Sequence, residues 1–136
     1  MKFIDSNIFL RYITQDDVRA QQAAAEVFAR LARGDDEGWT TDVHVHETVY
    51  VLASKRLYHV PHGEIRDRLR PLLLLGGLKL QNKRLCLEAL DIFAVHDTLD
   101  FADALAVALT RRHNLEGIFS FDKHFNSIPG VQRLEP

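Results

Sequence analysis

Four carboxylates lie where hydrophobic segments of this chain end or turn: Asp5, Glu47, Asp103 and Asp122. If such groups converge, two of them ~5 Å apart at an effective dielectric of ~20 repel by roughly 3 kcal/mol. Four together therefore require either a bound cation or protonation of some of them. Hard oxygen donors without thiolates select Mg²⁺ or Mn²⁺. A water on such an ion is a nucleophile near neutral pH, so the implied chemistry is phosphodiester hydrolysis.

Each acid also has a structural interpretation. Asp5 fits a helix cap as well as a ligand, and Asp122, taken alone, fits a turn. Glu47 has apolar neighbours at helical spacing, so we expect it on or near the buried face of its helix, where an unpaired carboxylate is costly. Asp100 and Asp103 are three residues apart and can share a helix face. Asp100 fits the cap better, and Asp103 then lies near the positive end of a core-facing helix.

Short hydrophobic segments alternate with longer stretches of helical periodicity. The segments predict strands over residues 2–4, 39–41, 78–80, 118–121 and 131–134. The periodic stretches predict helices over about 6–14, 18–33, 42–58, 61–75, 83–95 and 100–113. This alternation is typical of an α/β layered fold with a mainly parallel sheet.

The predicted strands place two of the acids together. Ligands of open parallel sheets bind outside the carboxyl ends of the strands. Asp5 and Asp122 each come directly after a predicted strand. We therefore expect these two carboxylates to lie on the same edge of the sheet.

Length and composition exclude several classes of protein. The chain has 136 residues, which predicts one domain over 1–136, and it is 46% hydrophobic and 26% charged. Its longest apolar run is too short to span a membrane, and a single cysteine, Cys86, favours a reducing, cytoplasmic location. The formal net charge is −2, so any contact with nucleic acid must be local.

Other catalytic motifs are incomplete. His46 and Glu47 resemble the start of a helical zinc motif, but Tyr50 stands where the second histidine is required. Gly76 and Gly77 lead into no Lys-Ser or Lys-Thr pair, so there is no phosphate-binding loop of that type. Cys86 has no recognisable catalytic partner in its local sequence.

The order of the acidic motifs resembles that of a known family, the PIN-domain ribonucleases of the VapC toxin kind. The opening Ile4-Asp5-Ser6-Asn7-Ile8-Phe9 is similar to the family's start, and residues 42–52 resemble the helix that carries the second acid. Residues 100–105 resemble the third motif, with Asp103 as its main acid, and residues 120–125 resemble the closing Ser/Thr-x-Asp segment. The likeness spans nearly the whole chain, in order and with the usual spacing.

The resemblance implies a three-layer α/β/α fold with a central sheet of about four to five strands. It also implies a Mg²⁺- or Mn²⁺-dependent endoribonuclease, with Asp5, Glu47, Asp103 and Asp122 around the metal. Asn7 and Ser120 would orient those acids. Asp100 is a fifth carboxylate, which acts as a cap, as an outer acid or as a competitor for the third position. A homodimer and a cognate antitoxin are implied as partners.

RNA bound at such a site requires basic residues outside it to hold phosphates. The candidates of the sequence are Lys55, Arg56, Arg66, Arg68, Arg70, Arg111, Arg112 and Lys123, of which Arg66 and Arg70 are four apart and can form a stripe. Two rival functions are open. An acidic phosphatase or phosphotransfer pocket requires an Asp pair at the first strand end, where this chain has Asn7. The other rival is a non-catalytic PIN-like binding module.

Overall fold

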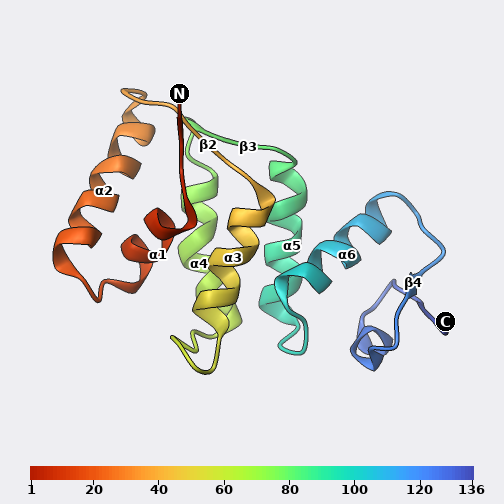
Figure 1. Cartoon of the computed structure of the whole chain (residues 1–136). Coiled ribbons are helices and arrows are strands. Elements are labelled where there is room, and N and C mark those ends of the chain that lie inside the picture. Colours follow the sequence, from red (N-terminus) through yellow and green to blue (C-terminus); the bar gives the residue numbers. More distant parts are fainter.

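A computed structural model describes all of residues 1–136 and contains five short strands and six α-helices (Figure 1). In chain order the elements are β1 (Lys2–Phe3), α1 (Ser6–Thr14), α2 (Val18–Arg33), β2 (Gly38–Thr40), α3 (Asp42–Ala53), α4 (His62–Leu73), β3 (Leu78–Leu80), α5 (Lys83–Val95), α6 (Phe101–Arg112), β4 (Ile118–Phe119), the 3₁₀ helix η1 (Lys123–Ser127) and β5 (Arg133–Leu134). The predicted class, a helix-rich α/β fold of the three-layer α/β/α type with a small parallel sheet, is confirmed.

Local signals fix most helix boundaries. Gln15 ends α1 in the left-handed region, and the side chain of Asp17 begins α2 by accepting a hydrogen bond of 3.0 Å from the N–H of Ala20. Gly34 ends α2 with a φ of 79°, a conformation that favours glycine. The sequence therefore predicted residues 18–33 correctly. The helix predicted to reach about residue 58 instead ends at Ala53, and the predicted helix over 61–75 runs from His62 to Leu73.

The first sheet has three parallel strands in the order β1-β2-β3. Its residues alternate between a buried and an exposed face, because successive side chains of a strand point to opposite sides. Thr40, Leu78 and Leu80 face the helices, whereas Trp39 and Lys79 face solvent. Gly38 lies so close to Ile4 that a Cβ added there would approach the side chain to 2.7 Å. The close packing of β1 on β2 therefore requires glycine at this position.

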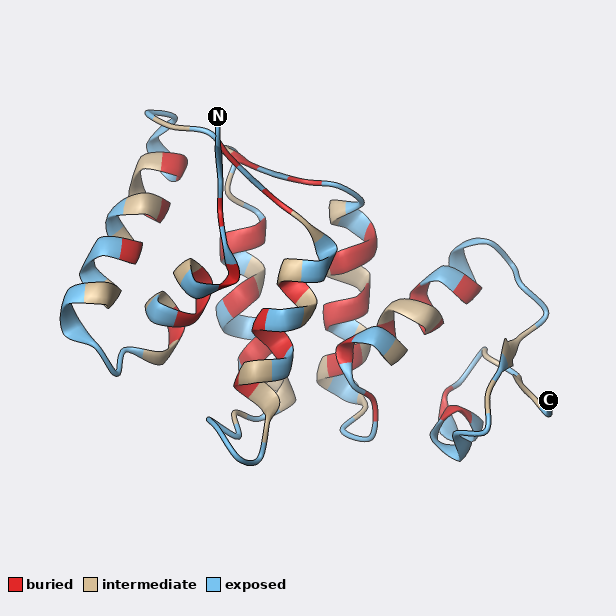
Figure 2. Cartoon of the chain, in the orientation of Figure 1, coloured by how far each residue is buried: buried red, intermediate tan, exposed pale blue.

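The remaining two strands form a separate parallel sheet, β4-β5. This corrects the prediction of one central sheet of four to five strands. A small apolar cluster of Leu99, Val107, Phe125 and Ile128 packs this C-terminal part of the chain against α6. Burial of those side chains holds β4 beside α6 rather than beside β1, and Figure 2 shows the segment as largely exposed around that cluster.

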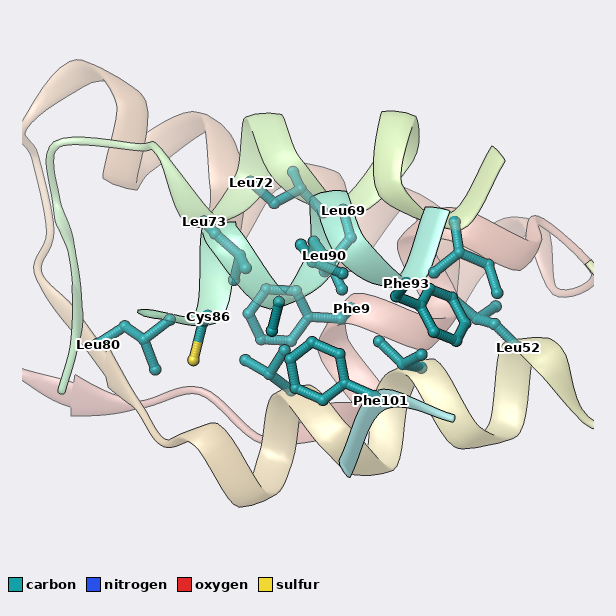
Figure 3. Close-up of a cluster of buried hydrophobic side chains, with 14 of the residues drawn as sticks. Phe9, Leu52, Leu69, Leu72, Leu73, Leu80, Cys86, Leu90, Phe93 and Phe101 are labelled. Atoms are coloured by element: carbon teal, nitrogen blue, oxygen red, sulfur yellow. The ribbon is translucent and has the colours of Figure 1, made fainter. Parts of the chain in front are cut away.

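The main core lies between the three-stranded sheet and the helices. It contains 23 buried residues, and Figure 3 shows Phe9, Phe93 and Phe101 packed among leucines from α3, α4 and α5. Cys86 lies in the same core. This core fixes α3 and α5 relative to α6, and these helices carry or border three of the candidate acids. No helix is both long and apolar enough to cross a membrane.

Candidate active site

The first turn of α6 holds two of the acids in a reciprocal arrangement. Asp100 precedes the helix, and its Oδ1 accepts a hydrogen bond of 2.8 Å from the N–H of Asp103. Oδ2 of Asp103 accepts one of 3.3 Å from the N–H of Asp100. This is a capping box, in which each side chain satisfies a main-chain donor that the helix cannot use. Of the roles predicted for Asp100, the structure assigns it the helix cap.

The pKa of Asp103 is raised above its usual value. Partial burial raises its pKa first, and the negative charges of Asp100 and Asp122 raise it further. The hydrogen bond from the N–H of Asp100 acts in the opposite direction and favours the ionised form. Asp122 lies after β4 and directly before η1. The structure therefore brings Asp100 and Asp122 within electrostatic reach of Asp103.

Asp122 begins the short helix η1. Its Oδ1 accepts a hydrogen bond of 2.9 Å from the N–H of His124, and Nδ1 of His124 lies 3.0 Å from the same oxygen. The hydroxyl of Ser120 accepts a hydrogen bond of 2.9 Å from the N–H of Asp122. Ser120 thus contacts the main chain of the acid that it was predicted to orient.

Asp5 caps the N-terminus of α1, shortly after β1. Its Oδ2 accepts a hydrogen bond of 3.2 Å from the main-chain N–H of Asn7, so Asn7 contacts the acid through its backbone. Nε2 of His44 lies 3.8 Å from Oδ1 of Asp5. Nδ1 of the same ring is 2.7 Å from the hydroxyl of Thr41, which fixes the orientation of the imidazole.

Glu47 does not lie on the buried face of its helix. The buried residues of α3 are Val45, Thr48, Val49 and Leu52, at the spacing of a single helical stripe. Glu47 falls beside that stripe and is exposed. The apolar neighbours that suggested burial, Val43 and Tyr50, are themselves exposed.

Asp5 and Asp122 follow strands of different sheets in this structure. β1, which leads to Asp5, belongs to the three-stranded sheet, whereas β4, which leads to Asp122, belongs to the two-stranded sheet. The expected common edge is therefore absent. No three acidic, histidine or cysteine side chains are arranged to hold a metal ion. The chemical type of the donors fits Mg²⁺ or Mn²⁺, but their positions do not.

Four of the eight predicted phosphate-binding cations have acidic partners. Arg66 and Arg70 lie on one side of α4, as predicted, but both pair with Asp91 of α5. Arg112 pairs with Glu88. Lys123 is exposed, forms no ion pair and stands directly after Asp122. Lys55 and Arg56 are likewise exposed and form no ion pair.

A pocket of about 380 Å³ opens beside the start of α6. It lies between α3 and the loop before α6, and its lining includes His46, Tyr50, Lys55, Asp97, Asp100 and Phe101. Nδ1 of His46 is buried without a hydrogen-bond partner in the protein. Aromatic side chains next to a lysine can accommodate a flat polar group such as a base.

Three histidines of the site region were not among the predicted site residues: His44, His46 and His124. For His124 a signal existed, because it follows Asp122 by two residues and the turn brings their side chains together. The rings of His44 and His46 are positioned only by packing of α3, His44 against Phe3 of β1 and His46 against Phe101 of α6. No local pattern distinguishes such histidines from ordinary ones.

Comparison with known proteins identifies the family. Residues 2–131 match the family model of the PIN domain. The chain belongs to the PIN domain family. Two curated relatives are the VapC ribonuclease Mb1869c of Mycobacterium bovis and the ribonuclease VapC13 of Mycobacterium tuberculosis, and each is 39% identical to this PIN domain over 46 residues. Those residues are 34% of this chain, and the match covers 35%, about a third, of the length of either relative.

Proposed function

We propose that this PIN domain is a divalent-metal-dependent endoribonuclease and the toxin of a type II toxin–antitoxin pair. The observation that carries the proposal is the placement of Asp103 beside Asp100 at the start of α6, near the charge of Asp122, where partial burial and these two charges raise the pKa of Asp103. Carboxylates held together at such a cost are typical of cation sites. Membership of the PIN family and the names of the two curated relatives support RNA cleavage as the reaction.

The proposed ligands of the ion are Asp5, Glu47, Asp103 and Asp122, and binding would require these acids to come closer together than they are in this structure. A bound Mg²⁺ or Mn²⁺ would supply an activated water and would offset charge on the phosphoryl group. Asp103 already has its rotamer set by the capping box, and Ser120 and His124 fix the segment around Asp122. The main-chain N–H of Asn7 orients the side chain of Asp5 by donating a hydrogen bond to it.

RNA would approach from the side of the pocket and the C-terminal segment. Lys55 lines the pocket and Lys123 adjoins Asp122, so both can hold phosphates without disrupting an ion pair of the fold. Tyr50 and Phe101 offer faces for stacking a base. Arg66, Arg70 and Arg112 would contribute only after leaving their acidic partners.

The test is cleavage of single-stranded RNA by the purified protein with Mg²⁺ or Mn²⁺. We expect activity that EDTA removes and that Asp103→Asn abolishes. The matched control is Asp35→Asn, because Asp35 is an exposed acid of the loop before β2, and this variant should retain wild-type activity. RNA binding without cleavage would favour a binding module, and hydrolysis of a phosphomonoester but not of RNA would favour a phosphatase.

The toxin role has its own test. If a small DNA-binding protein is encoded directly upstream, co-expression should yield a stable complex in which RNA cleavage is suppressed. Activity that is unchanged by that protein, with no complex on size-exclusion chromatography, would leave a ribonuclease without an antitoxin.

A further inference from the structure

The pocket beside the start of α6 has an apolar lining that belongs to the core. Phe93 and Phe101 both line it, and Figure 3 shows their rings among the buried side chains of the main cluster. Val49 and Leu99 line it as well, and each of these four side chains is only 1% exposed. Because core side chains are closely packed, a pocket that they line keeps its shape without a ligand.

Aromatic rings from two helices form the rest of the lining. The ring of His62 stacks on that of Phe93, with 3.7 Å between the centroids and 9° between the planes, and its Nδ1 lies 2.9 Å from the Phe93 carbonyl. A carbonyl only accepts hydrogen bonds, so this nitrogen is the donor and Nε2 of the neutral ring is a free acceptor. Tyr50 is 63% exposed, which leaves a face of its ring open to a flat ligand.

His46 brings to the pocket a polar atom that the protein does not satisfy. Its Nδ1 is buried and contacts no donor or acceptor of the chain. The ring is positioned by packing alone, 6.4 Å from the ring of Tyr50 and 6.3 Å from that of Phe101. No hydrogen bond fixes the imidazole, so it can turn and pair with a polar group of a ligand. An unpaired polar atom of this kind is unfavourable in the empty protein and is relieved by binding.

The rim of the pocket carries a carboxylate without a partner. Asp97 is exposed and forms no ion pair and no side-chain hydrogen bond, whereas Asp100 already uses one oxygen to cap α6. Ser54 and Thr98 add hydroxyl groups, which both donate and accept and so do not discriminate between ligands. Asp97 is therefore the group of the rim that sets which polar edge fits.

A second pocket, of about 440 Å³, adjoins the first. Lys55, His62 and Asp97 line both pockets, so they stand at the boundary between the two. Lys55 is exposed and has no acidic partner, which leaves its ammonium group available to a phosphate. A ligand longer than one nucleotide can therefore continue from the first pocket into the second past this lysine.

The combination of an aromatic wall, a hydrogen-bonding rim and a free lysine fits an unpaired nucleotide. A carboxylate accepts two parallel hydrogen bonds best from two neighbouring donors, and guanine presents such a pair in its ring N–H and its amino group. Adenine and cytosine place an acceptor nitrogen beside the amino group. Uracil places a carbonyl on each side of its N–H. Both acceptors repel a carboxylate, so Asp97 favours guanine over the other three bases.

We propose that this pocket binds one unpaired guanine of the RNA, stacked on Tyr50 and hydrogen-bonded to Asp97, and so selects the nucleotide beside the bond that is cut. The pocket reaches Asp100, which shares a capping box with Asp103, so the bound nucleotide lies next to a proposed metal ligand. The position relative to the cut rests on the proposed function, whereas the binding of guanine does not.

An NMR titration in EDTA tests the binding without reference to cleavage. The isotope-labelled protein is titrated with the monophosphates of guanosine, adenosine, cytidine and uridine, and EDTA prevents their phosphates from binding through a divalent ion. We expect guanosine monophosphate to bind most tightly and to shift the amide signals of residues 46–55 and 97–101, which carry most of the lining. Equal affinity for the four nucleotides, or shifts confined to other segments, would overturn the proposal.

An asparagine at position 97 should change the preferred base. An amide both donates and accepts, which matches adenine, so the ratio of guanosine to adenosine monophosphate affinity should fall roughly tenfold or more in Asp97→Asn. Asp35→Asn makes the same change at an exposed acid far along the chain and should leave this ratio at its wild-type value. An unchanged ratio in Asp97→Asn would contradict recognition of the base by Asp97.

Replacement of Tyr50 tests the stacking. Tyr50→Ala should weaken all four nucleotides by similar factors of roughly fivefold or more, because every base has a face that stacks on an aromatic ring. Tyr50→Phe keeps the ring and should bind like wild type. Tyr50 is mostly exposed, so neither change disturbs the core. Wild-type affinity in Tyr50→Ala would show that the nucleotide is not stacked there, against the proposal.

Cleavage of designed RNAs tests the position of the guanine. Oligouridine strands with a single guanosine, adenosine or cytidine are incubated with the protein and Mg²⁺ or Mn²⁺. We expect cuts beside the guanosine, and cuts beside guanosine and adenosine alike in Asp97→Asn. Cleavage by wild type without a preferred base would overturn the inference and leave the proposed function intact. Guanine binding in the NMR titration without cleavage of any strand would refute the proposed function alone.

Discussion

Replacement of Asp103 by asparagine should stabilise the metal-free protein. Burial and the charges of Asp100 and Asp122 raise the pKa of Asp103 above its usual value of 3.8. The folded protein therefore holds the Asp103 proton more tightly than the unfolded chain does, and the ionised side chain destabilises the fold. Asparagine removes the charge, while its Oδ1 can still accept the hydrogen bond from the N–H of Asp100 that the carboxylate now accepts at 3.3 Å.

The magnitude follows from the geometry of the capping box. Two carboxylates about 5 Å apart repel by ~3 kcal/mol at a dielectric of ~20 and by ~1 kcal/mol in water. Because the Asp100 side chain is exposed, the lower value applies, and a gain of about 1 kcal/mol raises the melting temperature by roughly 3–5 °C. The difference in stability between Asp103→Asn and wild type depends on pH. Below the unfolded pKa both proteins are alike, and the advantage of the variant appears as pH rises through the folded-state pKa of Asp103.

Thermal melting in EDTA, followed by circular dichroism from pH 3 to pH 8, measures this difference. A control variant, Asp35→Asn, should melt like wild type at each pH. With millimolar Mn²⁺ the order should reverse, because the ion binds the folded wild type and not Asp103→Asn. If Asp103→Asn melts below wild type in EDTA at pH 7, then the carboxylate stabilises α6 and the reasoning from charge repulsion is wrong.

Three further predictions concern the fold. Gly77→Ala should lower the free energy of unfolding by about 1–3 kcal/mol in urea, because the new Cβ would lie 2.5 Å from the carbonyl oxygen of Leu31. The control is Gly63→Ala in the open first turn of α4, which should be neutral or stabilising. Asp17→Ala should lower it by ~1 kcal/mol through loss of the α2 cap, and Asp17→Asn by only a few tenths; equal losses would exclude capping as the cause. Burial raises the pKa of the Cys86 thiol to about 11, so the native protein should resist iodoacetamide at pH 8 and react fully in denaturant, and rapid native labelling would show that the core opens.

The sequence predicted the elements well wherever local chemistry decides them. Asp17 and Gly34 bound α2 at the predicted residues, and β3 has the predicted residues 78–80. The end of α3 was missed, because the residues after Ala53 favour a helix by composition while the chain turns at Ser54. Helix propensity alone did not signal this turn.

The local positions of three candidate acids could be predicted from the sequence, but the arrangement of the acids could not. The position of each acid after a strand or at a helix start could be read from neighbouring residues, and Asp5, Asp103 and Asp122 all stand at such positions. Which strands pair is decided by long-range packing, here by the cluster around Phe125 and Ile128 that holds β4 to α6. Glu47 was expected on the buried face of α3, but the buried stripe contains its neighbour Thr48 instead.

The capping box of α6 also determines how much order a ligand must impose. Asp100 and Asp103 each use a carboxylate oxygen to accept a main-chain N–H, so folding of the helix already selects their rotamers. The conformational entropy of both side chains is therefore lost before any ion arrives. Binding of an ion would not bear that entropic loss again, so the same two hydrogen bonds that begin a helix would preorganise Asp103 in the proposed site.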